Sequence, residues 1–454
     1  MPVKILILLS SIKATCIDRP DLQYPFLSFT IYLPMNEAIR INKYMPIAII
    51  YFFFNSFLLP SGLLYTTILT PLFLLWLYQQ NHLKNIAAFF IVTIPFAVVH
   101  FINGVDPIFY LISYTLLFTA FVFSLCFIEF VKKCNTLRKI FRLIIILNFF
   151  FLLIACIAFF IPAIKSSFWL ITFVSSGLDK FPRLKLLTYE PSYYSLLLVP
   201  IVVYYSLKLL FFDLPNPWLV GLLIAFPLLL AFSLGILIGI PLAIFILFLM
   251  KMKLFFTKKY LRQYILLTTF SILIAIVLLL IFYPDNPLFI RINNLFIGHD
   301  SSFKGRTSDS YYLAWTVVNK KNIFFGVGLG QVKVLGLELW RNFYQYNFSS
   351  SEIAIPNATA DTFAVFGIAG VCIRLAIEIF FFIRTKVYTN YYRLTLFIFI
   401  FIYQFTGSYL YNIAEFVLWI MAFSNTFPEF DQKNLSPAVL KARFYPAGRK
   451  ANSG

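Results

Sequence analysis

The chain has 454 residues, of which 61% are hydrophobic, 20% aromatic and only 12% charged. A soluble protein could not hide this much apolar surface from water, so the composition excludes an ordinary globular domain and predicts a protein that crosses a membrane several times. The formal net charge of +19 would suggest nucleic acid in a soluble protein. In a membrane protein, positive charge mainly indicates which loops lie in the cytoplasm. We therefore expect no nucleic-acid partner.

After a basic lead-in over residues 1–43, which has no convincing signal peptide, the chain contains about twelve apolar segments, most of them long enough to cross a bilayer. They lie near residues 46–60, 62–78, 86–103, 107–128, 141–161, 192–211, 217–233, 235–250, 261–283, 360–383, 394–406 and 411–424. The sequence therefore predicts an all-α polytopic membrane domain over residues 44–424 and a basic tail over residues 425–454.

Most of the 37 Lys and Arg residues lie in loops on one side of the predicted spans. Loops rich in Lys and Arg stay in the cytoplasm, so this side is predicted to be cytoplasmic and to hold both termini. Two long loops, residues 162–191 and 284–359, are left on the outer face. We therefore expect chemistry on the outer face to come from these two loops.

Cysteine and histidine usage gives no sign of a disulfide or a metal. The five cysteines lie in predicted spans or in cytoplasmic loops. The three histidines, His82, His100 and His299, are far apart and lack the spacing of metal ligands. The short cytoplasmic loops contain no Walker-type phosphate loop. We therefore predict no metal and no cofactor.

The most polar long stretch of the chain, residues 305–330, lies in the second predicted outer loop. Thr307 or Ser308 can act as a helix N-cap, which places Arg306 at the start of a short amphipathic helix. The predicted apolar face of this helix consists of Tyr311, Trp315 and Val318. A guanidinium beside a helix N-terminus can bind phosphate without a metal. The alternative is an interfacial helix whose arginine only reaches toward water.

The first outer loop ends with a carboxylate beside cationic side chains. The cationic residues are Lys180, Arg183 and Lys185. Pro191 suits the first turn of a helix, so Glu190 is predicted at the N-cap of the next span, facing the outer side. There Glu190 either caps the helix or acts as a general base on a hydroxyl, because a partly desolvated carboxylate suits that role.

Several short motifs follow one another along the outer loops and the spans. They are Tyr189-Glu190-Pro191-Ser192-Tyr193-Tyr194, Gly305-Arg306-Thr307 with Trp315, Gly326-Val327-Gly328-Leu329-Gly330, Asn357 with Phe366-Gly367-Ile368-Ala369-Gly370, and Thr406-Gly407-Ser408 with Trp419. In this order they resemble the O-antigen polymerase and O-antigen ligase superfamily of bacterial envelopes. The resemblance covers residues 140–425.

The resemblance implies a GT-C-like, metal-independent membrane glycosyltransferase of the bacterial inner membrane. Such a polymerase joins undecaprenyl-diphosphate-linked repeat units into O-antigen of lipopolysaccharide, capsule or exopolysaccharide at the outer face. Its implied partners are the lipid-linked glycan, the bilayer, a flippase and a chain-length regulator. Cationic outer loops suit the two diphosphates that it must hold.

Carried over by position, the resemblance implies a catalytic pair. Arg306 is the candidate clamp for the donor diphosphate, and Glu190 is the candidate base for the acceptor hydroxyl. The further candidates for substrate binding are Arg183, Lys185, Tyr193, Arg291, His299, Lys304 and Arg341.

Two departures from the family pattern bear on function. Pro356 precedes Asn357 where similar ligases carry a His, which favours a polymerase over an O-antigen ligase that transfers glycan to a lipid or protein acceptor. Ser233-Leu234 stands where many members carry Ser-Arg.

Charges inside the predicted spans keep a further alternative open. Arg374 and Glu378 are spaced for an internal ion pair, and Glu415 lies near the last span. Because charges within spans often mark transport pathways, a lipid-linked oligosaccharide flippase is the second alternative.

Overall fold

The computed structural model describes most of the chain between residues 45 and 435. The described residues are 45–57, 59, 63–134, 136–173, 177–178, 180–212, 214–251, 283, 286–298, 300–350 and 352–435. The predicted lead-in over residues 1–43, the predicted span over residues 261–283, apart from residue 283, and most of the predicted tail lie outside them.

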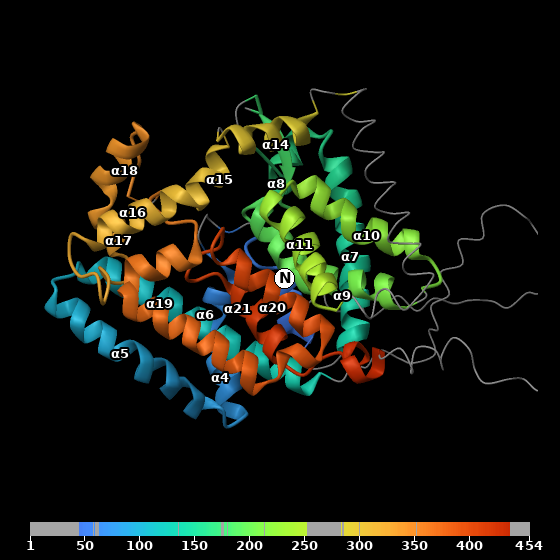
Figure 1. The fold of residues 1–454 in the computed structure, drawn as a ribbon, viewed down its shortest axis with the longest axis horizontal. Coiled ribbons are helices and arrows are strands. Elements are labelled where there is room, and N and C mark those ends of the chain that lie inside the picture. The colour runs from blue at the N-terminus through green and yellow to red at the C-terminus, as the bar shows by residue number, and fades with distance from the viewer. Residues whose placement is uncertain are drawn as a thin grey trace, which may run out of the picture. The chain divides into compact units, whose positions relative to one another are not determined.

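The described part is mostly helical, as the sequence predicts (Figure 1). Its α-helices are α2 (Met45–Phe52), α3 (Tyr65–Ile68), α4 (Thr70–Gln79), α5 (Ala87–Ile102), α6 (Pro107–Lys133), α7 (Leu137–Ala158), α8 (Pro162–Phe168), α9 (Pro191–Phe211), α10 (Pro217–Ala231), α11 (Leu234–Met250), α14 (Pro287–Ile297), α15 (Ser301–Arg306), α16 (Ser308–Val318), α17 (Gln331–Leu335), α18 (Leu337–Tyr344), α19 (Ala358–Arg384), α20 (Tyr391–Tyr403) and α21 (Ile413–Phe423).

Five of the described helices are long and apolar enough to cross a membrane. They are α5 with the turn before it, α6, α7, α9 and α19. The apolar helices α10, α11, α20 and α21 coincide with further predicted spans but are shorter. At 1.5 Å per residue, the 11 residues of α21 cover only about 17 Å, roughly half of a hydrocarbon core. The long apolar helices confirm the coarse prediction of a helical membrane protein. The number of twelve spans stays a prediction.

Local sequence signals explain where the long helices begin. Asp106 accepts hydrogen bonds from the backbone N–H of Ile108 at 2.9 Å and of Phe109 at 3.1 Å, which caps α6. Asn357 caps α19 in the same way by accepting from Ala360 N–H at 2.9 Å. Pro191 occupies the first turn of α9, as the sequence predicts.

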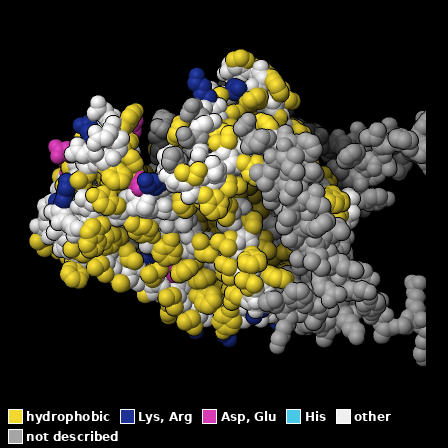
Figure 2. Space-filling model, turned by 45° about the horizontal axis from the view of Figure 1, so that its top comes forward, with side chains coloured by type: hydrophobic (Ala, Val, Ile, Leu, Met, Phe, Trp, Pro, Cys, Tyr) yellow, Lys and Arg dark blue, Asp and Glu magenta, His cyan; other side chains and the backbone are white. Residues whose placement is uncertain are grey.

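The helix α9 lies at the centre of the largest core. It packs against α10, α11, α20 and α21, and most of its side chains are buried. The outer helices expose large apolar side chains instead, including Ile91 and Ile102 of α5, at 73% and 78% exposure. Figure 2 shows hydrophobic side chains spread over one face of the molecule. Such a surface is suited to lipid rather than to water.

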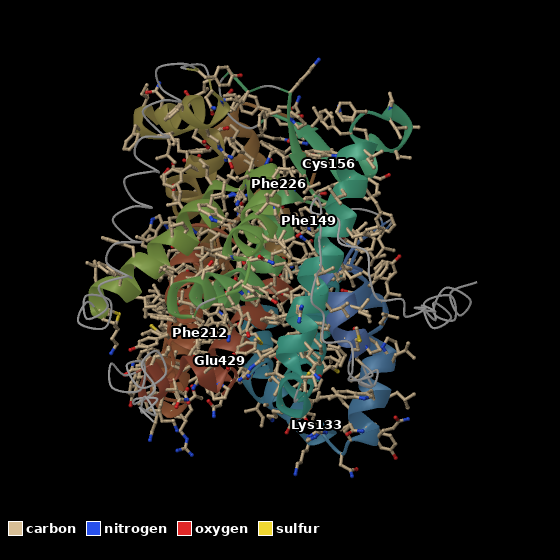
Figure 3. All side chains as sticks on the ribbon, turned by 90° about the vertical axis from the view of Figure 1, so that its right-hand side faces the viewer. Lys133, Phe149, Cys156, Phe212, Phe226 and Glu429 are labelled. Carbon is tan, nitrogen blue, oxygen red and sulfur yellow. The ribbon has the colours of Figure 1, made fainter. Side chains whose placement is uncertain are left out.

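Loops that are predicted to share the cytoplasmic side do meet at one end of the helices. Glu129 pairs with His82, Lys132 and Lys133, each at 3.2 Å. Glu429 pairs in the same region of the molecule with Arg138 at 2.6 Å and with Lys208 at 3.4 Å. Figure 3 shows Lys133 and Glu429 near one end and Cys156 near the other. The assignment of that end to the cytoplasm stays a prediction.

The first outer loop departs from an all-α fold. It contains a short antiparallel hairpin of β1 (Trp169–Thr172) and β2 (Phe181–Leu184). Trp169 lies opposite Leu184, and Thr172 lies opposite Phe181. The second outer loop is helical and contains α14 to α18.

The glycine-rich run over residues 326–330 is a packing element. The helix α19 is interrupted at Gly367, with φ 66° and ψ −163°. Val327 N–H donates to Ala364 O at 2.9 Å, and Ile368 N–H donates to Ile323 O at 3.0 Å, so the loop backbone occupies the interruption. A side chain at Gly326 would meet Val365 O at 2.3 Å. The glycines thus allow two backbones to touch.

Candidate functional site

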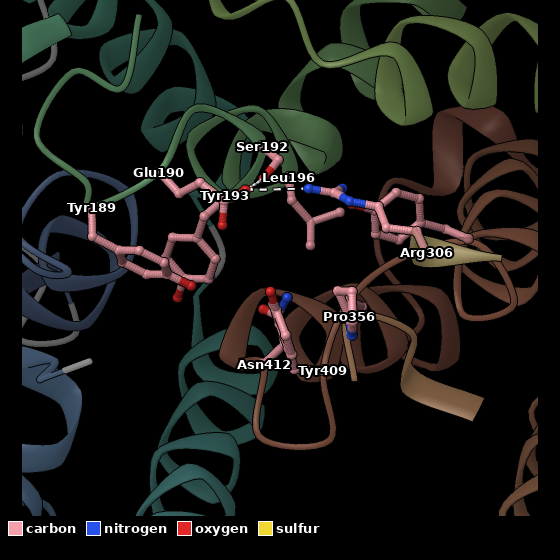
Figure 4. A pocket seen from close by; sticks show the side chains of 11 residues that line it. Tyr189, Glu190, Ser192, Tyr193, Leu196, Arg306, Pro356, Tyr409 and Asn412 are labelled. Atoms are coloured by element: carbon pink, nitrogen blue, oxygen red, sulfur yellow. Dashed lines mark hydrogen bonds and ion pairs between the residues drawn. The ribbon is translucent and has the colours of Figure 1, made fainter. Parts of the chain in front are cut away.

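The two loops that are predicted to lie outside, residues 162–191 and 284–359, meet at a pocket beside the connection between α20 and α21 (Figure 4). Its lining residues are Tyr189, Glu190, Ser192, Tyr193, Leu196, Arg306, Pro356, Tyr403, Ser408, Tyr409 and Asn412. The lining is rich in hydroxyl groups and contains one guanidinium and one carboxylate. Among the described residues that line it there is no histidine.

The predicted catalytic pair, Glu190 and Arg306, comes together in this pocket. Arg306 Nη2 lies 3.3 Å from Glu190 Oε1, although the residues are 116 positions apart in the chain. Ser192 Oγ donates a hydrogen bond to the same oxygen. The two charged side chains are 24% and 25% exposed, so a solute can reach them. Figure 4 shows the two side chains reaching toward each other across the pocket.

Glu190 stands at the N-cap position of α9, but its side chain makes no capping hydrogen bond. The carboxylate is turned to Arg306 and Ser192 instead. The sequence leaves open whether Glu190 caps the helix or acts as a general base. The geometry does not support the capping role. A carboxylate held beside hydroxyl groups is suited to take up a proton from a bound hydroxyl.

Arg306 is the last residue of α15 rather than part of α16. The predicted short helix exists as α16, and Thr307 is its N-cap residue, but no side-chain cap bond forms. The predicted apolar face differs from the packed one, since Tyr311 and Trp315 are 37% and 52% exposed and only Val318 is buried. The buried face also contains Ser310, Leu313, Ala314 and Val317. Small residues there allow close packing against α19.

Asn357 holds the two sides of the pocket together. Its side-chain Nδ2 donates to the backbone oxygen of Arg306 at 2.8 Å and to that of Phe405 at 2.6 Å. The next residue, Ala358, donates its N–H to Gly407 O at 2.9 Å. The loop that carries Arg306 and the connection that carries Ser408 are therefore fixed to the start of α19.

Electrostatics keep the Arg306 guanidinium charged and the phenols of the pocket neutral. Burial is the largest single effect and opposes the charge of Arg306, but Glu190 together with Tyr403 and Tyr409 raises the pKa of Arg306 above its usual value. Burial raises the pKa of Tyr409, and Glu190 adds to this effect. Burial also raises the pKa of Tyr189. Tyr189 and Tyr409 are thus neutral hydroxyl donors at neutral pH.

Two further arginines lie next to the pair. Arg291 is buried and bonded to Asp300 Oδ2 at 3.0 Å and to Phe232 O at 3.0 Å, so its charge is already matched. Arg183 donates from Nε to Ala231 O at 3.2 Å, and burial, together with Arg291, lowers the pKa of Arg183 to about 10. In the described part of the chain, Arg183 forms no ion pair with a carboxylate. Both arginines lie against the turn that leads to Ser233-Leu234.

The other predicted binding residues are scattered. Tyr193 lines the pocket, and its ring stacks on Tyr189 with centroids 4.9 Å apart. Lys185 is half-buried, and burial lowers its pKa. Lys304 is exposed on α15, and Arg341 on α18 donates to Phe348 O at 3.0 Å. Lys185, Lys304 and Arg341 do not line the pocket. His299 lies outside the described residues.

Sequence reasoning misses the pocket wall that the α20–α21 connection contributes. Its residues are Tyr403, Ser408, Tyr409 and Asn412. Only Ser408 belongs to a motif that the sequence analysis quotes, and no spacing connects these residues to Glu190 or Arg306. One available signal was the break between two short apolar helices, which brings polar groups to the end of the helices. Among the described residues, no cluster of His, Cys, Asp and Glu side chains could hold a metal ion.

The chain matches no known family model, and no curated protein is similar to it in sequence. The resemblance to O-antigen polymerases and ligases therefore rests on the quoted motifs alone. The geometry of the pocket has to carry the functional argument.

Proposed function

We propose that this protein is a membrane glycosyltransferase that polymerises repeat units carried on undecaprenyl diphosphate, at the outer face of the bacterial inner membrane. The observation that carries the proposal is the meeting of Glu190 and Arg306 in one pocket. The two belong to separate loops, and each comes from a motif that resembles the polymerase family. A cation for a diphosphate and a base for a hydroxyl are the two groups that the reaction needs.

In the proposed reaction, the acceptor hydroxyl oxygen attacks the anomeric carbon of the donor glycan. The bond from that carbon to the diphosphate oxygen breaks, and the bonding electrons leave with the diphosphate. Arg306 stabilises the negative charge that develops on this leaving group. Glu190 takes the proton of the acceptor hydroxyl, which completes the balance.

Arg183 is the proposed second contact for the diphosphate. A diphosphate carries more than one negative charge, and Arg306 already faces Glu190. Arg183 is held by a backbone oxygen, and Glu190 and Arg306 both lie within electrostatic reach of it. Its positive charge is therefore available to a second anion.

The pocket favours a polymerase over a ligase. Pro356 lines the pocket at the place where similar ligases carry a His. A ligase of that type would need an imidazole that the described lining lacks. The proposed partners, a flippase and a chain-length regulator, follow from the resemblance only.

The experiment is a reconstitution of the purified full-length chain in vesicles with a lipid-linked repeat unit. Longer lipid-linked glycans should appear without any other enzyme, and Arg306→Ala should abolish them. Lys320→Ala is the matched control, because Lys320 is an exposed cation of the same loop outside the pocket. Transfer of the repeat unit across the bilayer without elongation would show a flippase. Transfer only to a lipid or protein acceptor would show a ligase.

A further inference from the structure

Ser408, which lines the pocket, has a backbone conformation that is rare for serine. Its φ is 70°, in the left-handed region that favours glycine. A glycine does stand next to it, but the φ of Gly407 is not positive. Gly407 is required for packing instead, because a side chain there would meet the Tyr403 ring at 2.8 Å. The chain therefore has serine at the position of this turn where glycine would be less strained.

Hydrogen bonds with α19 hold this turn on both sides of Ser408. Before it, Ala358 N–H donates to Gly407 O at 2.9 Å. After it, Leu410 N–H donates to Asp361 Oδ2 at 3.1 Å. A strained conformation persists only where the surrounding structure fixes it in this way, and such strain is concentrated at binding and catalytic sites. The Ser408 side chain is therefore held in one place before any substrate binds.

The hydroxyl group of Ser408 contributes no side-chain hydrogen bond to the described part of the fold. The residue is 5% exposed, and its Oγ is buried without a partner among the described residues. A serine hydroxyl can donate one hydrogen bond and accept two, and leaving it unpaired in a protein interior is unfavourable. Because Ser408 lines the pocket, a ligand that binds there can supply the partner.

The other described residues with positive φ, glycine aside, have a structural reason for it. Three of them lie at helix ends, where left-handed backbone is common, and three pack large apolar side chains into hydrophobic cores. They are Asn81, Gln345 and Lys386, and Leu186, Phe232 and Phe427. Ser408 lies beyond the C-cap of α20 and has a small polar side chain. Neither reason applies to Ser408, which points to a role in the pocket instead.

The side of the pocket that contains Ser408 is suited to a neutral ligand group. Figure 4 shows Tyr409 and Asn412, from the same connection, across the pocket from Glu190. Burial raises the pKa of Tyr409, and Glu190 is the next strongest influence, ahead of Arg306. The carboxylate therefore acts on this side of the pocket, where an anionic diphosphate would be repelled. A sugar ring instead offers neutral hydroxyl groups that can both donate and accept.

We propose that Ser408 binds a hydroxyl group of the acceptor sugar across the pocket from Glu190, and thereby turns the reacting hydroxyl of that sugar toward the carboxylate. This inference rests on the function proposed above and assigns the sugar-binding side of its pocket. Arg306 contacts the donor diphosphate, whereas Ser408 contacts a part of the acceptor that does not react. Its fixed conformation means that little side-chain freedom is lost when the sugar binds.

The test is glycan elongation by the purified full-length protein in vesicles, with and without sugar-free undecaprenyl diphosphate as an inhibitor. Ser408→Ala should raise the concentration of lipid-linked repeat unit that gives half-maximal elongation by about three- to tenfold, as loss of one hydrogen bond does. The inhibition constant of the sugar-free lipid should stay unchanged, because that lipid carries only the diphosphate.

The possible results separate this inference from the proposed function. If Ser408→Ala weakens inhibition by the sugar-free lipid to the same degree, the hydroxyl contacts the diphosphate and the sugar contact is wrong. If neither quantity moves while the wild-type protein elongates, the inference fails alone. A wild-type protein that does not elongate would overturn the proposed function, and this inference with it.

Thermal unfolding of the same variants shows whether the hydroxyl serves the fold instead. Ser408→Ala should melt within about 2 °C of wild type, because no hydrogen bond within the protein is lost. Ser408→Gly should melt slightly higher, because it relieves the positive φ, yet lose as much affinity for the repeat unit as Ser408→Ala. If Ser408→Ala melts several degrees lower, the hydroxyl supports the fold and the substrate contact is refuted.

Lys386→Gly is the matched control for relief of backbone strain. Lys386 has φ 52°, is exposed, and follows the far end of α19 from the pocket. Its replacement by glycine should raise the melting temperature in the same way as Ser408→Gly and leave elongation unchanged. If Lys386→Gly impairs elongation as Ser408→Gly does, the loss comes from the added glycine rather than from the hydroxyl, and the inference is wrong.

Discussion

Arg306 has a carboxylate neighbour in the pocket, and this neighbour limits what the guanidinium can do. Glu190 Oε1 lies 3.3 Å from its Nη2, and the pair is partly open to solvent. Partly exposed ion pairs contribute little to folding, about 1 kcal/mol or less. The pair therefore holds the guanidinium in place at small energetic cost, and an incoming diphosphate with more than one charge can compete with Glu190 for it.

Arg306→Lys is expected to fail in glycan elongation nearly as badly as Arg306→Ala. An ammonium keeps the positive charge but loses the planar fork that can hold two oxygens at once. The measurement is the ladder of glycan lengths, together with binding of the lipid diphosphate donor, at matched amounts of protein in the membrane. Full ladders from the Lys variant would make Arg306 a general surface charge and turn attention to Arg183.

Glu190→Gln is expected to lower elongation about a hundredfold or more, since general base catalysis typically contributes that much. Protein abundance should stay unchanged, because the Glu190 side chain makes no capping bond for α9. Donor binding should not weaken, because the variant removes only the carboxylate that faces Arg306. A Gln variant with normal polymer would leave Glu190 without a catalytic role.

At the scale of elements, the contact between the glycine run and α19 determines where the second outer loop sits. The interruption at Gly367 frees backbone groups of α19, and residues 323–328 bond to them. His100 Nε2 also donates to Phe325 O at 2.7 Å, which fixes the same segment to α5. This arrangement requires glycine, because positive φ and close backbone contact coincide at Gly326.

Gly326→Ala is expected to destabilise the protein by about 2 kcal/mol or more, through backbone strain at φ 78° and a clash with Val365 O. Gly221→Ala is the matched control, since a side chain at Gly221 in α10 would meet no atom within 4 Å. Thermal unfolding in detergent measures both variants. Equal melting temperatures of the two variants would contradict the packing role of the glycine run.

Local signals predicted the elements better than the site. Pro191 marks the start of α9, as predicted, because proline preferences act over a few residues. The packed face of α16 was not predictable in this way, because it is determined by the neighbouring elements: Ala314 is fully buried, whereas Trp315 is 52% exposed. Tyr409 could not be connected to Glu190 from spacing, since α20 and α21 place it there through tertiary packing.

The two ends of the helix bundle differ chemically. One end carries ion pairs, and the other carries the pocket. Glu129 and Glu429 form ion pairs with basic residues from segments that are far apart in sequence. At the opposite end, the loops join Glu190 to Arg306. The predicted distribution of Lys and Arg assigns the first end to the cytoplasm.

Single cysteines introduced at Lys304 and Lys433, in a background without the native cysteines, should react from opposite sides of the membrane. Both positions are exposed, so a reagent that cannot cross the bilayer can reach them. Lys304 should be labelled from the outside of sealed cells, and Lys433 only after the membrane is opened. Labelling of both from one side would overturn the predicted topology.

The interruption of α19 also determines how this protein can be recombined with relatives in chimeras. The backbone from residue 323 to residue 328 and the two turns of α19 around Gly367 complete each other's hydrogen bonds. An exchange of the second outer loop alone would separate these partners and leave polar backbone groups unbonded inside the bundle. A working crossover point therefore has to follow Ala369, so that the loop and the first part of α19 are transferred together as one cassette.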